Sequence, residues 1–347
     1  MSIERLKING VTFAHHAKPK VPNIGDKLCA PYLYFHFKLT PQSRFTGRCL
    51  VVGGGAIAGA RDLYRDAGYR ARIVWAAGIS RAYGARPSQP SPSLLRRVRC
   101  KLGQIKRSAI RRIVRLREGR EIVVVSSRDP DVSTPDMFVP CVSCFHDVCD
   151  TARGHGVAVI INENPDVSGE AGDLLEALRA RYPDVVFATN AMTEDQLLEI
   201  FAKTDRIITN SYHMTYWSLL SGGKVRVIGY SSKLESVLEI IGFETDHILR
   251  YTRGDQGALE GALRKALDSE DWLSLPDPDA IRAHFRGLNR DFAERVMTAI
   301  PDLTITPAAR VFIDDDGHAV SAGGVAHIVK AADARHEHVR RRHIRVA

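Results

Sequence analysis

Short runs of apolar residues alternate with longer amphipathic segments along most of the chain. In the second half, Leu174, Leu175 and Leu178 stand at helical spacing. Thr193 is placed to cap the next helix. Alternating strands and helices are the repeat unit of a parallel α/β sheet. The predicted strands are residues 49–52, 71–77, 121–125, 157–161, 185–188, 206–209 and 225–228, and the predicted helices are residues 60–67, 171–181, 194–201, 212–220 and 236–241.

This alternation occurs in both halves of the chain. It predicts an α/β protein with two doubly wound, Rossmann-like domains that face a cleft, as in the GT-B type of two-domain architecture. We place the N-terminal domain at residues 1–153 and the C-terminal domain at residues 154–306. Residues 307–347 differ in pattern, because 311–318 predict a small hairpin with an Asp-Gly turn and the end of the chain is basic.

Composition adds limits on the class of protein. The 347 residues are 44% hydrophobic and 26% charged, which is typical of a globular protein long enough for two cores. No apolar run approaches the ~18 residues of a membrane span, and the first residues lack the apolar core of a cleaved leader. Six cysteines do not imply a disulfide scaffold. We therefore expect a cytoplasmic protein.

Positive charge is concentrated in residues 96–120, where Glu118 is the only acidic residue, and the net charge of the chain is +9. Such a segment attracts phosphates, nucleic acid or acidic lipid head groups. It lacks the interleaved aromatic residues that stack on bases, which argues against a nucleic-acid-binding protein. Two interpretations remain: a solvated helical face, and peripheral contact with the inner face of a membrane.

The most informative segment runs from residue 206 to residue 243. A predicted strand ends at Asn210 and Ser211, and His213 follows where a helix begins. Lys233 follows the next predicted strand. Ligands of open α/β sheets bind at the carboxyl ends of strands, where helix N-termini favour anions. His213 and Lys233 are therefore candidates to bind a phosphate or carboxylate and to move a proton. The simpler interpretation is a capped histidine and a surface lysine.

Several short motifs, in the same order and at similar spacing, resemble those of the polysaccharide pyruvyl transferase family. The resemblance covers roughly residues 20–245. Its motifs are Asn23-Ile24-Gly25-Asp26, Gly53-Gly54-Gly55, Trp75-Ala76-Ala77-Gly78-Ile79, Ser127-Arg128-Asp129, Asn210-Ser211-Tyr212-His213, Ser221-Gly222-Gly223, the strand from Val225 to Tyr230, and Lys233.

The resemblance implies a transferase that moves a pyruvyl group from phosphoenolpyruvate to a sugar of a surface or exopolysaccharide precursor, forming a cyclic ketal and releasing phosphate. It implies His213 as general acid, and Asp26 as a possible base near the acceptor sugar. The acceptor would be a sugar or lipid-linked oligosaccharide on the N-terminal side, and phosphoenolpyruvate would bind on the C-terminal side. The implied reaction demands no metal and no cofactor. The implied substrate-binding residues are Lys233, Arg128, Asn23, Gly54, Gly55 and Ser211.

One position departs from the family. The family often has an arginine two residues before the histidine, where this chain has Ser211. The cationic role implied there would pass to Lys233, Arg128 or another residue. An inactive homologue is therefore an alternative to an active enzyme.

Other readings of the same segments stay open. A nucleotide-sugar glycosyltransferase on the same plan would use an acid of the second half, such as Glu235, to hold a ribose. Nicotinamide binding is disfavoured, because Ala58 stands where the dinucleotide fingerprint needs glycine and the next strand lacks the ribose-binding acid. Arg128 and Asp129 could instead form a structural ion pair.

The cysteine-rich segment contains Cys141, Cys144, His146 and Cys149 within nine residues. A structural zinc site usually draws its ligands from two separated pairs, because one short loop rarely closes a tetrahedron. We therefore expect buried cysteines and a histidine that lines the cleft.

Overall fold

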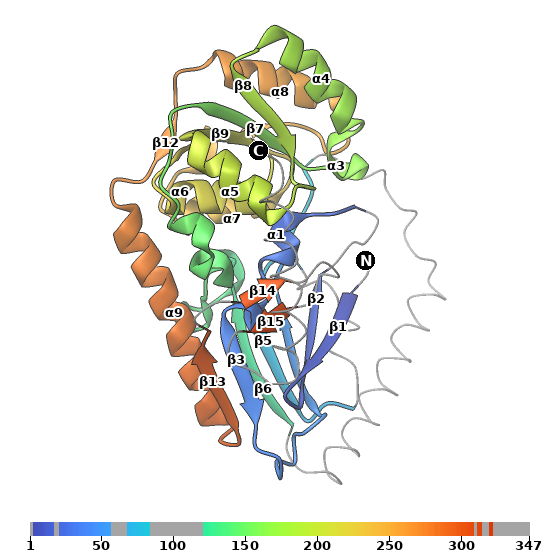
Figure 1. Ribbon diagram of the computed structural model, residues 1–347, viewed down its shortest axis with the longest axis vertical. Coiled ribbons are helices and arrows are strands. Elements are labelled where there is room, and N and C mark those ends of the chain that lie inside the picture. Colours follow the sequence, from blue (N-terminus) through green and yellow to red (C-terminus); the bar gives the residue numbers. More distant parts are fainter. Residues whose placement is uncertain are drawn as a thin grey trace, which may run out of the picture.

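The computed structural model describes residues 3–16, 21–56, 68–83, 121–308, 311–313 and 319–321. The predicted helix at 60–67, the basic segment at 96–120 and the chain beyond 321 lie outside the described residues. Figure 1 shows one sheet above the other, with helix α9 running down the side of the lower one. The fold is mixed α/β with largely parallel sheets, as the alternation of strands and helices predicts.

The first sheet has the strand order β1-β2-β4-β5-β6. Its strands β2, β4, β5 and β6 are parallel, and β1 pairs antiparallel with β2. The β1–β2 turn consists of Asn9 (φ 49°) and Gly10 (φ 83°), both left-handed, as a tight hairpin requires. The bounds are β1 Ile3–Ile8, β2 Val11–His16, β4 Cys49–Gly53, β5 Ala71–Ala77 and β6 Ile122–Ser127.

The second sheet has the order β11-β10-β9-β7-β8, with β12 antiparallel to β10 at one end. The four predicted strands of this half are confirmed. The strands are β7 Val157–Ile161, β8 Val185–Thr189, β9 Arg206–Thr209, β10 Lys224–Gly229, β11 Leu249–Arg250 and β12 Leu273–Ser274.

Helices connect these strands. The predicted cap at Thr193 is confirmed, since its side chain accepts from Gln196 N and Gln196 reaches back to the cap. The helix predicted at 236–241 instead begins at Ser232, which places Lys233 in its first turn. The bounds are α1 Ile24–Lys27, α3 Pro165–Ser168, α4 Ala171–Arg181, α5 Glu194–Lys203, α6 Tyr212–Leu220, α7 Ser232–Glu239, α8 Gln256–Asp268 and α9 Pro278–Ala299. Short 3-10 helices are η1 Pro31–Leu33, η2 Pro130–Val132, η3 Pro135–Met137, η4 Val142–Phe145, η5 Asp147–Cys149 and η6 Thr245–His247.

The chain returns to the first sheet before residue 306. Phe292 and Val296 of α9 belong to the core of the first half, and β13 (Leu303–Pro307) pairs antiparallel with β3 (Phe35–Leu39). Residues 154–306 therefore do not all pack with the second sheet, and the division into domains stays a prediction. The predicted hairpin is present as β14 (Val311–Ile313) and β15 (Ala319–Ser321); its turn lies outside the described residues.

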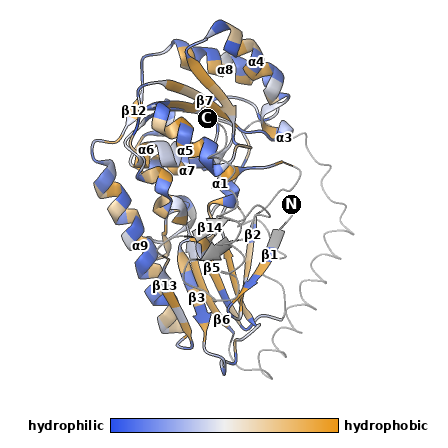
Figure 2. Ribbon diagram, in the orientation of Figure 1, coloured by the Kyte–Doolittle hydropathy of each residue, from blue (hydrophilic) through white to orange (hydrophobic). Residues whose placement is uncertain are grey.

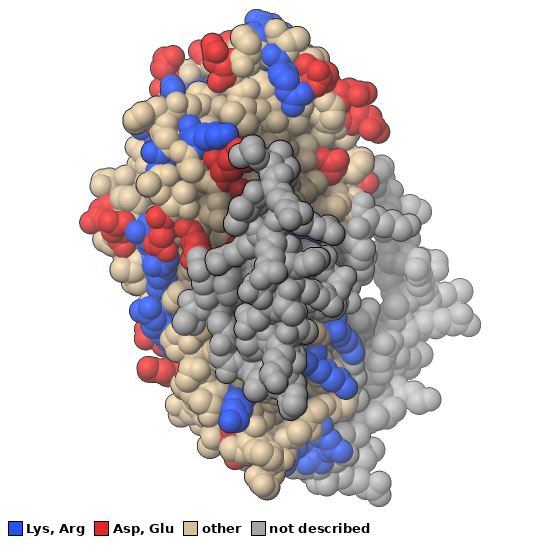
Figure 3. All heavy atoms as spheres, viewed as in Figure 1, with Lys and Arg blue, Asp and Glu red and all other residues tan. Residues whose placement is uncertain are grey.

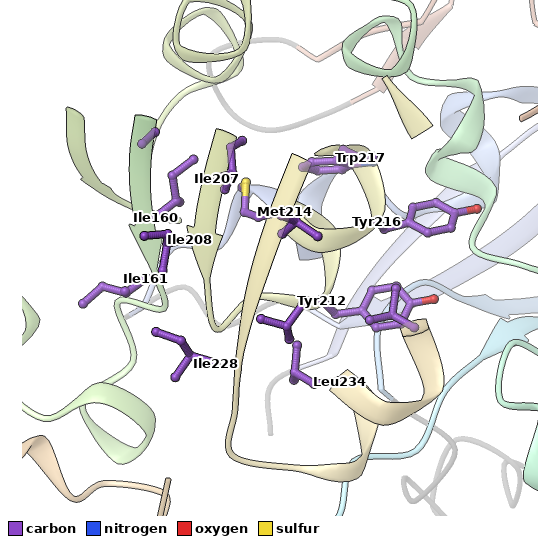
Figure 4. Packing of buried hydrophobic residues seen from close by; sticks show 14 of the residues in the cluster. Ile160, Ile161, Ile207, Ile208, Tyr212, Met214, Tyr216, Trp217, Ile228 and Leu234 are labelled. Carbon is purple, nitrogen blue, oxygen red and sulfur yellow. The ribbon is translucent and has the colours of Figure 1, made fainter. Parts of the chain in front are cut away.

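Two large apolar cores hold these layers together. Strands are mostly hydrophobic, and helices α4, α8 and α9 turn polar residues outward (Figure 2). In the second core, Ile160 and Ile208 of the sheet lie near Met214 and Trp217 of α6 (Figure 4). Every residue of α6 is buried, so this helix lies inside the protein and carries His213 with it.

The surface of the described residues carries both signs of charge. On the face in Figure 3, acidic and basic side chains are mixed around the second sheet, and basic ones predominate at the lower right. Within the described ranges, no helix has both the length and the apolar character that a membrane span requires.

Candidate functional site

The carboxyl ends of the two parallel sheets meet, and the loops that follow their strands are joined by hydrogen bonds. Ile24 N donates to Asn190 O at 2.8 Å, and Tyr83 N donates to Tyr230 O at 2.8 Å. Figure 1 shows α1 between the two sheets. Because ligands of such sheets bind at this edge, the junction is the candidate site.

The turn that begins α1 contributes Asn23 and Asp26. Asn23 caps the helix: its Oδ1 accepts from Gly25 N at 3.0 Å, and its Nδ2 donates to Asp26 Oδ2 at 2.9 Å. The Asn23 side chain therefore organises this turn and holds the Asp26 carboxylate. A side chain at Gly25 would place its Cβ 2.3 Å from His213 Nδ1. The turn thus packs directly on the candidate histidine, although the two lie far apart in the sequence.

His213 stands in the first turn of α6 and is only 4% exposed. Its ring packs against Trp217, with centroids 5.3 Å apart, and its Nε2 lies 3.6 Å from Cys141 Sγ. Burial lowers the pKa of His213 to about 3, and the cations of Arg128 and Lys233 act in the same direction while Asp26 opposes them. The imidazole is therefore neutral at neutral pH in the free protein.

The burial of His213 predicts that the unfolding free energy falls in acid. The His213 pKa is about 3 in the folded protein and about 6.5 in the unfolded chain, so between these values only the unfolded chain binds the proton. The neutral His213 imidazole makes its full contribution to the unfolding free energy above pH ~6.5. This contribution is lost as the pH falls toward 3, at up to ~1.4 kcal/mol per pH unit. We expect denaturant titrations from pH 7 to pH 4 to show a shallower decline in unfolding free energy for His213→Gln. Equal slopes would contradict the buried neutral imidazole.

Arg128 follows β6 and is 2% exposed. Its guanidinium lies over the Tyr212 ring, 3.8 Å from the ring centroid. A Cβ at Gly78 would come within 2.3 Å of Arg128 Nε, so glycine is needed there to admit the guanidinium. Within the described chain, Arg128 Nε and Nη1 are buried without a hydrogen-bond partner. A buried, unpaired charge is costly in free energy, and its presence indicates a site for an anion.

The alternative of an Arg128–Asp129 ion pair is not what the structure shows. The Asp129 carboxylate accepts from Ile79 N and from Ser236 Oγ, the latter at 2.7 Å. Among the described residues no salt bridge joins Arg128 to Asp129. Asp129 instead ties the end of the first sheet to α7. Burial acts to lower the pKa of Arg128 and Asp129 acts through space to raise it, while Arg128 Nε and Nη1 keep no hydrogen-bond partner among the described residues.

Lys233 lies in the first turn of α7, with its Nζ 4.8 Å from the centroid of the Tyr230 ring. Burial lowers the pKa of Lys233 to about 8, with the nearby cations Arg128 and Arg253 adding to the effect and Asp26 opposing it. Arg128, Lys233 and Arg253 thus lie close enough to repel one another. An anion bound between them would relieve that repulsion.

Ser211, Gly54 and Gly55 have structural roles of their own. Ser211 stands at the cap of α6, where its carbonyl accepts from Thr215 N and Oγ1, and its side chain makes no capping bond. Gly54 has a left-handed backbone (φ 83°), and a Cβ there would lie 2.8 Å from Cys29 O and Sγ. Gly55 O accepts from Gly78 N at 3.2 Å. These residues shape the edge beside the charged groups.

The structure therefore places His213 and Lys233 where the charges of Asp26 and Arg128 shift the pKa of each. Reasoning from the sequence missed Tyr212, which lies under Arg128, and Arg253. Tyr212 stands beside His213 in the motif that drew attention to the histidine, so an aromatic neighbour there was the available signal.

The cysteine-rich segment is packed into the core, and burial of Cys141, Cys144 and Cys149 is confirmed. The His146 ring is also only 6% exposed; its Nδ1 accepts from Val148 N, and its Nε2 lies 3.1 Å from Glu194 Oε1. In the part of the chain that the structure describes, no three His, Cys, Asp or Glu side chains are grouped as metal ligands.

Comparison with known proteins adds little. No family model matches the chain, and no curated protein is detectably similar. Among solved structures, the glycotransferase of kitacinnamycin aligns over 73% of this chain and 74% of its own, with 15% identity and a TM-score of 0.32. The UDP-glucose:anthocyanidin 3-O-glucosyltransferase in complex with UDP aligns over 70% and 56%, with 11% identity and a TM-score of 0.27. At these scores neither likeness carries an argument about fold or function.

Proposed function

We propose that this chain is a transferase that binds an anionic donor at the junction of its two sheets. We further propose that the donor is phosphoenolpyruvate and that the acceptor is a sugar of a surface polysaccharide precursor, as the resemblance of the sequence motifs implies. The observation that carries the proposal is the buried Arg128 guanidinium with its unpaired Nε and Nη1, beside Lys233 and His213. Phosphate and carboxylate oxygens are the natural partners of such donors.

Phosphoenolpyruvate would bring both kinds of anionic group to the site. Arg128 and Lys233 would hold them and stabilise the charge that develops on the departing phosphate. Because the bound anion offsets the two cations that help to lower the His213 pKa, donor binding would raise that pKa. With the donor bound, His213 would thus hold a proton more readily than in the free protein, while burial, the larger cause of its low pKa, would still act.

The proposed reaction has two steps, an addition and a displacement. One sugar hydroxyl adds its oxygen to the enol carbon and loses its proton to Asp26, while His213 delivers a proton to the methylene carbon, which becomes a methyl group. A second hydroxyl of the same sugar then displaces phosphate from that carbon and closes the ketal ring; its proton returns to His213, and the proton on Asp26 leaves with the released phosphate. Asp26, held by Asn23 on the α1 turn, is placed near His213 and Lys233 to accept a hydroxyl proton.

A nucleotide-sugar glycosyltransferase is the second candidate, because the same cations would bind a diphosphate as well as phosphoenolpyruvate. The acid expected to hold its ribose, Glu235, already pairs with Arg250, with Oε1 accepting from Nη2 at 2.8 Å. A ribose would have to replace that ion pair. The donor that the protein binds therefore distinguishes pyruvyl transfer from glycosyl transfer.

Calorimetric titration with phosphoenolpyruvate tests the proposal. We expect saturable binding by the parent, weakened by ~10-fold or more in Lys233→Ala and weakened less in His213→Ala, since a charge-assisted hydrogen bond contributes ~1.5–3 kcal/mol. Lys203→Ala, which removes an exposed lysine paired with Glu199, is the matched control and should bind as the parent does.

The same titration has a pH signature. Lys233 is cationic below its pKa of about 8, so affinity should fall as the pH rises through 8, by up to ~10-fold per unit. In Lys233→Ala this fall should be absent. Binding of uridine diphosphate but not phosphoenolpyruvate would overturn pyruvyl transfer and favour the glycosyltransferase.

A further inference from the structure

The Arg128 guanidinium lies with its face against the ring of Tyr212. Its carbon lies 3.8 Å from the centroid of the Tyr212 ring, while Nε and Nη1 make no hydrogen bond to any described residue. A cation over an aromatic face is attracted by the ring quadrupole, and the attraction is strongest where water is excluded. At 2% exposure for both side chains, this contact is desolvated.

The Tyr212 ring is itself fixed in place. It stacks on Tyr216 one turn later in α6, with centroids 5.9 Å apart, and Tyr216 stacks on Phe285 of α9 at the same separation. Figure 4 shows the two tyrosine rings side by side, extending in the same direction from α6. Tyr216 OH donates to Cys141 O at 2.9 Å, whereas Tyr212 OH has no hydrogen-bond partner among the described residues. The ring of Tyr212 is therefore the part that contacts Arg128.

A second buried arginine, Arg226, also lies over an aromatic ring but differs from Arg128 in its hydrogen bonds. Arg226 also lies 3.8 Å from an aromatic centroid, that of Trp272, and is 5% exposed. However, its Nε donates to Asp271 O at 2.6 Å and its Nη1 donates to Ala266 O. Those two donors bond to the protein itself, and Nη2 is the Arg226 nitrogen that is buried without a partner among the described residues. Arg128 makes the same kind of contact with a ring, but its Nε and Nη1 make no hydrogen bond to the described residues.

We propose that Tyr212 is a positioning residue for the anion site: its ring fixes the face of the Arg128 guanidinium so that the donor N–H groups stay free for the ligand. This inference rests on the proposed anion site but not on the identity of the donor. A hydrogen-bonded anchor would hold the guanidinium equally well, but it would use the N–H groups that an anion needs. Stacking holds it without using them.

The test is a double-mutant cycle on anion affinity. Tyr212→Phe and Tyr212→Leu are made in the parent and in Arg128→Met, and inorganic phosphate, phosphoenolpyruvate and uridine diphosphate are titrated by calorimetry. We expect Tyr212→Leu to weaken binding ~10-fold and Tyr212→Phe to stay within ~2-fold, because phenylalanine keeps the ring face. In the Arg128→Met background, Tyr212→Leu should have no further effect. Thermal unfolding checks that each variant is folded, and Tyr212→Met replaces Tyr212→Leu if the latter does not fold.

The outcomes separate the two proposals. Equal losses in Tyr212→Phe and Tyr212→Leu would overturn the inference, because the hydroxyl would then be the ligand contact. An undiminished effect of Tyr212→Leu in Arg128→Met would overturn it as well. If the parent binds uridine diphosphate but not phosphoenolpyruvate and the cycle behaves as expected, the inference stands and pyruvyl transfer fails. A parent that binds none of the three anions contradicts both.

Discussion

Arg128→Met is expected to weaken anion binding by ~100-fold, leaving a weak affinity that can still be measured, and to leave the protein as stable as the parent or more stable. Two donors to an anion, each worth ~1.5–3 kcal/mol, disappear with the guanidinium. In the free protein those donors have no partner among the described residues, so no acceptor in that part of the chain is left unsatisfied by the change. A buried charge without a hydrogen-bond partner costs free energy, so an apolar side chain of similar volume in its place should be neutral or stabilising. Calorimetry with phosphoenolpyruvate and denaturant unfolding measure the two effects.

Arg226→Met is the matched control. That arginine is equally buried and also stacked, but its removal leaves the carbonyls of Asp271 and Ala266 without their donors. We expect it to destabilise the protein by ~1–3 kcal/mol per carbonyl and to leave anion binding intact. If Arg128→Met were the destabilising change of the two, Arg128 would be a structural residue and the proposed site would be wrong.

Gly25→Ala is expected to cost ~2–4 kcal/mol of unfolding free energy and to impair the site at the same time. The new methyl carbon would stand 2.3 Å from His213 Nδ1 and 2.7 Å from His213 Cγ. The imidazole cannot easily retreat, because it packs against Trp217 and Tyr212. Either the ring leaves its place or the α1 turn moves and weakens the bond from Ile24 N to Asn190 O. Overpacking of this kind is strongly destabilising.

Gly172→Ala provides the comparison, because a Cβ at this position in α4 meets nothing within 4 Å. It should stabilise the protein by ~0.5–1 kcal/mol, since alanine favours the helix more than glycine does. In a His213→Ala background the cost of Gly25→Ala should shrink, because the ring atoms are gone and only His213 Cβ, at 2.8 Å, remains close. An unchanged cost would show that the strain lies elsewhere in the turn.

Arg128→Met and Gly25→Ala show that the site combines tight packing with a buried charge that has no hydrogen-bond partner among the described residues. Gly25 is needed because His213 is close, and Gly78 is needed because Arg128 is close. Each glycine lies in a different sequence motif from the site residue that it accommodates. Stability lost at the unpaired guanidinium is the kind of cost that functional sites carry, which is why Arg128→Met separates stability from binding.

Much of the second half could be predicted from the sequence, because its signals are local. Buried parallel strands are short apolar runs, and the helices between them repeat their leucines at helical spacing. The cap at Thr193 requires only Gln196 three residues later. The Asn-Gly pair at residues 9–10 was an equally local signal, for a hairpin that was not predicted. Sequence motifs alone also indicate the candidate residues Asp26, Arg128, His213 and Lys233.

Only the tertiary structure decided how these segments meet. The pairing of β13 with β3 joins residues more than 250 positions apart, and the return of α9 to the first sheet brings Phe292 against Trp75, more than 200 positions apart. No local pattern encodes such contacts. The same is true of the contact between Gly25 and His213 and of the Tyr212 ring under Arg128. Hydrophobic periodicity determines which face of a segment is buried, because burial follows from the spacing of apolar residues. Which segments then share that burial depends on packing across the whole chain, and it is this packing that leaves Arg128 buried with its donors unpaired.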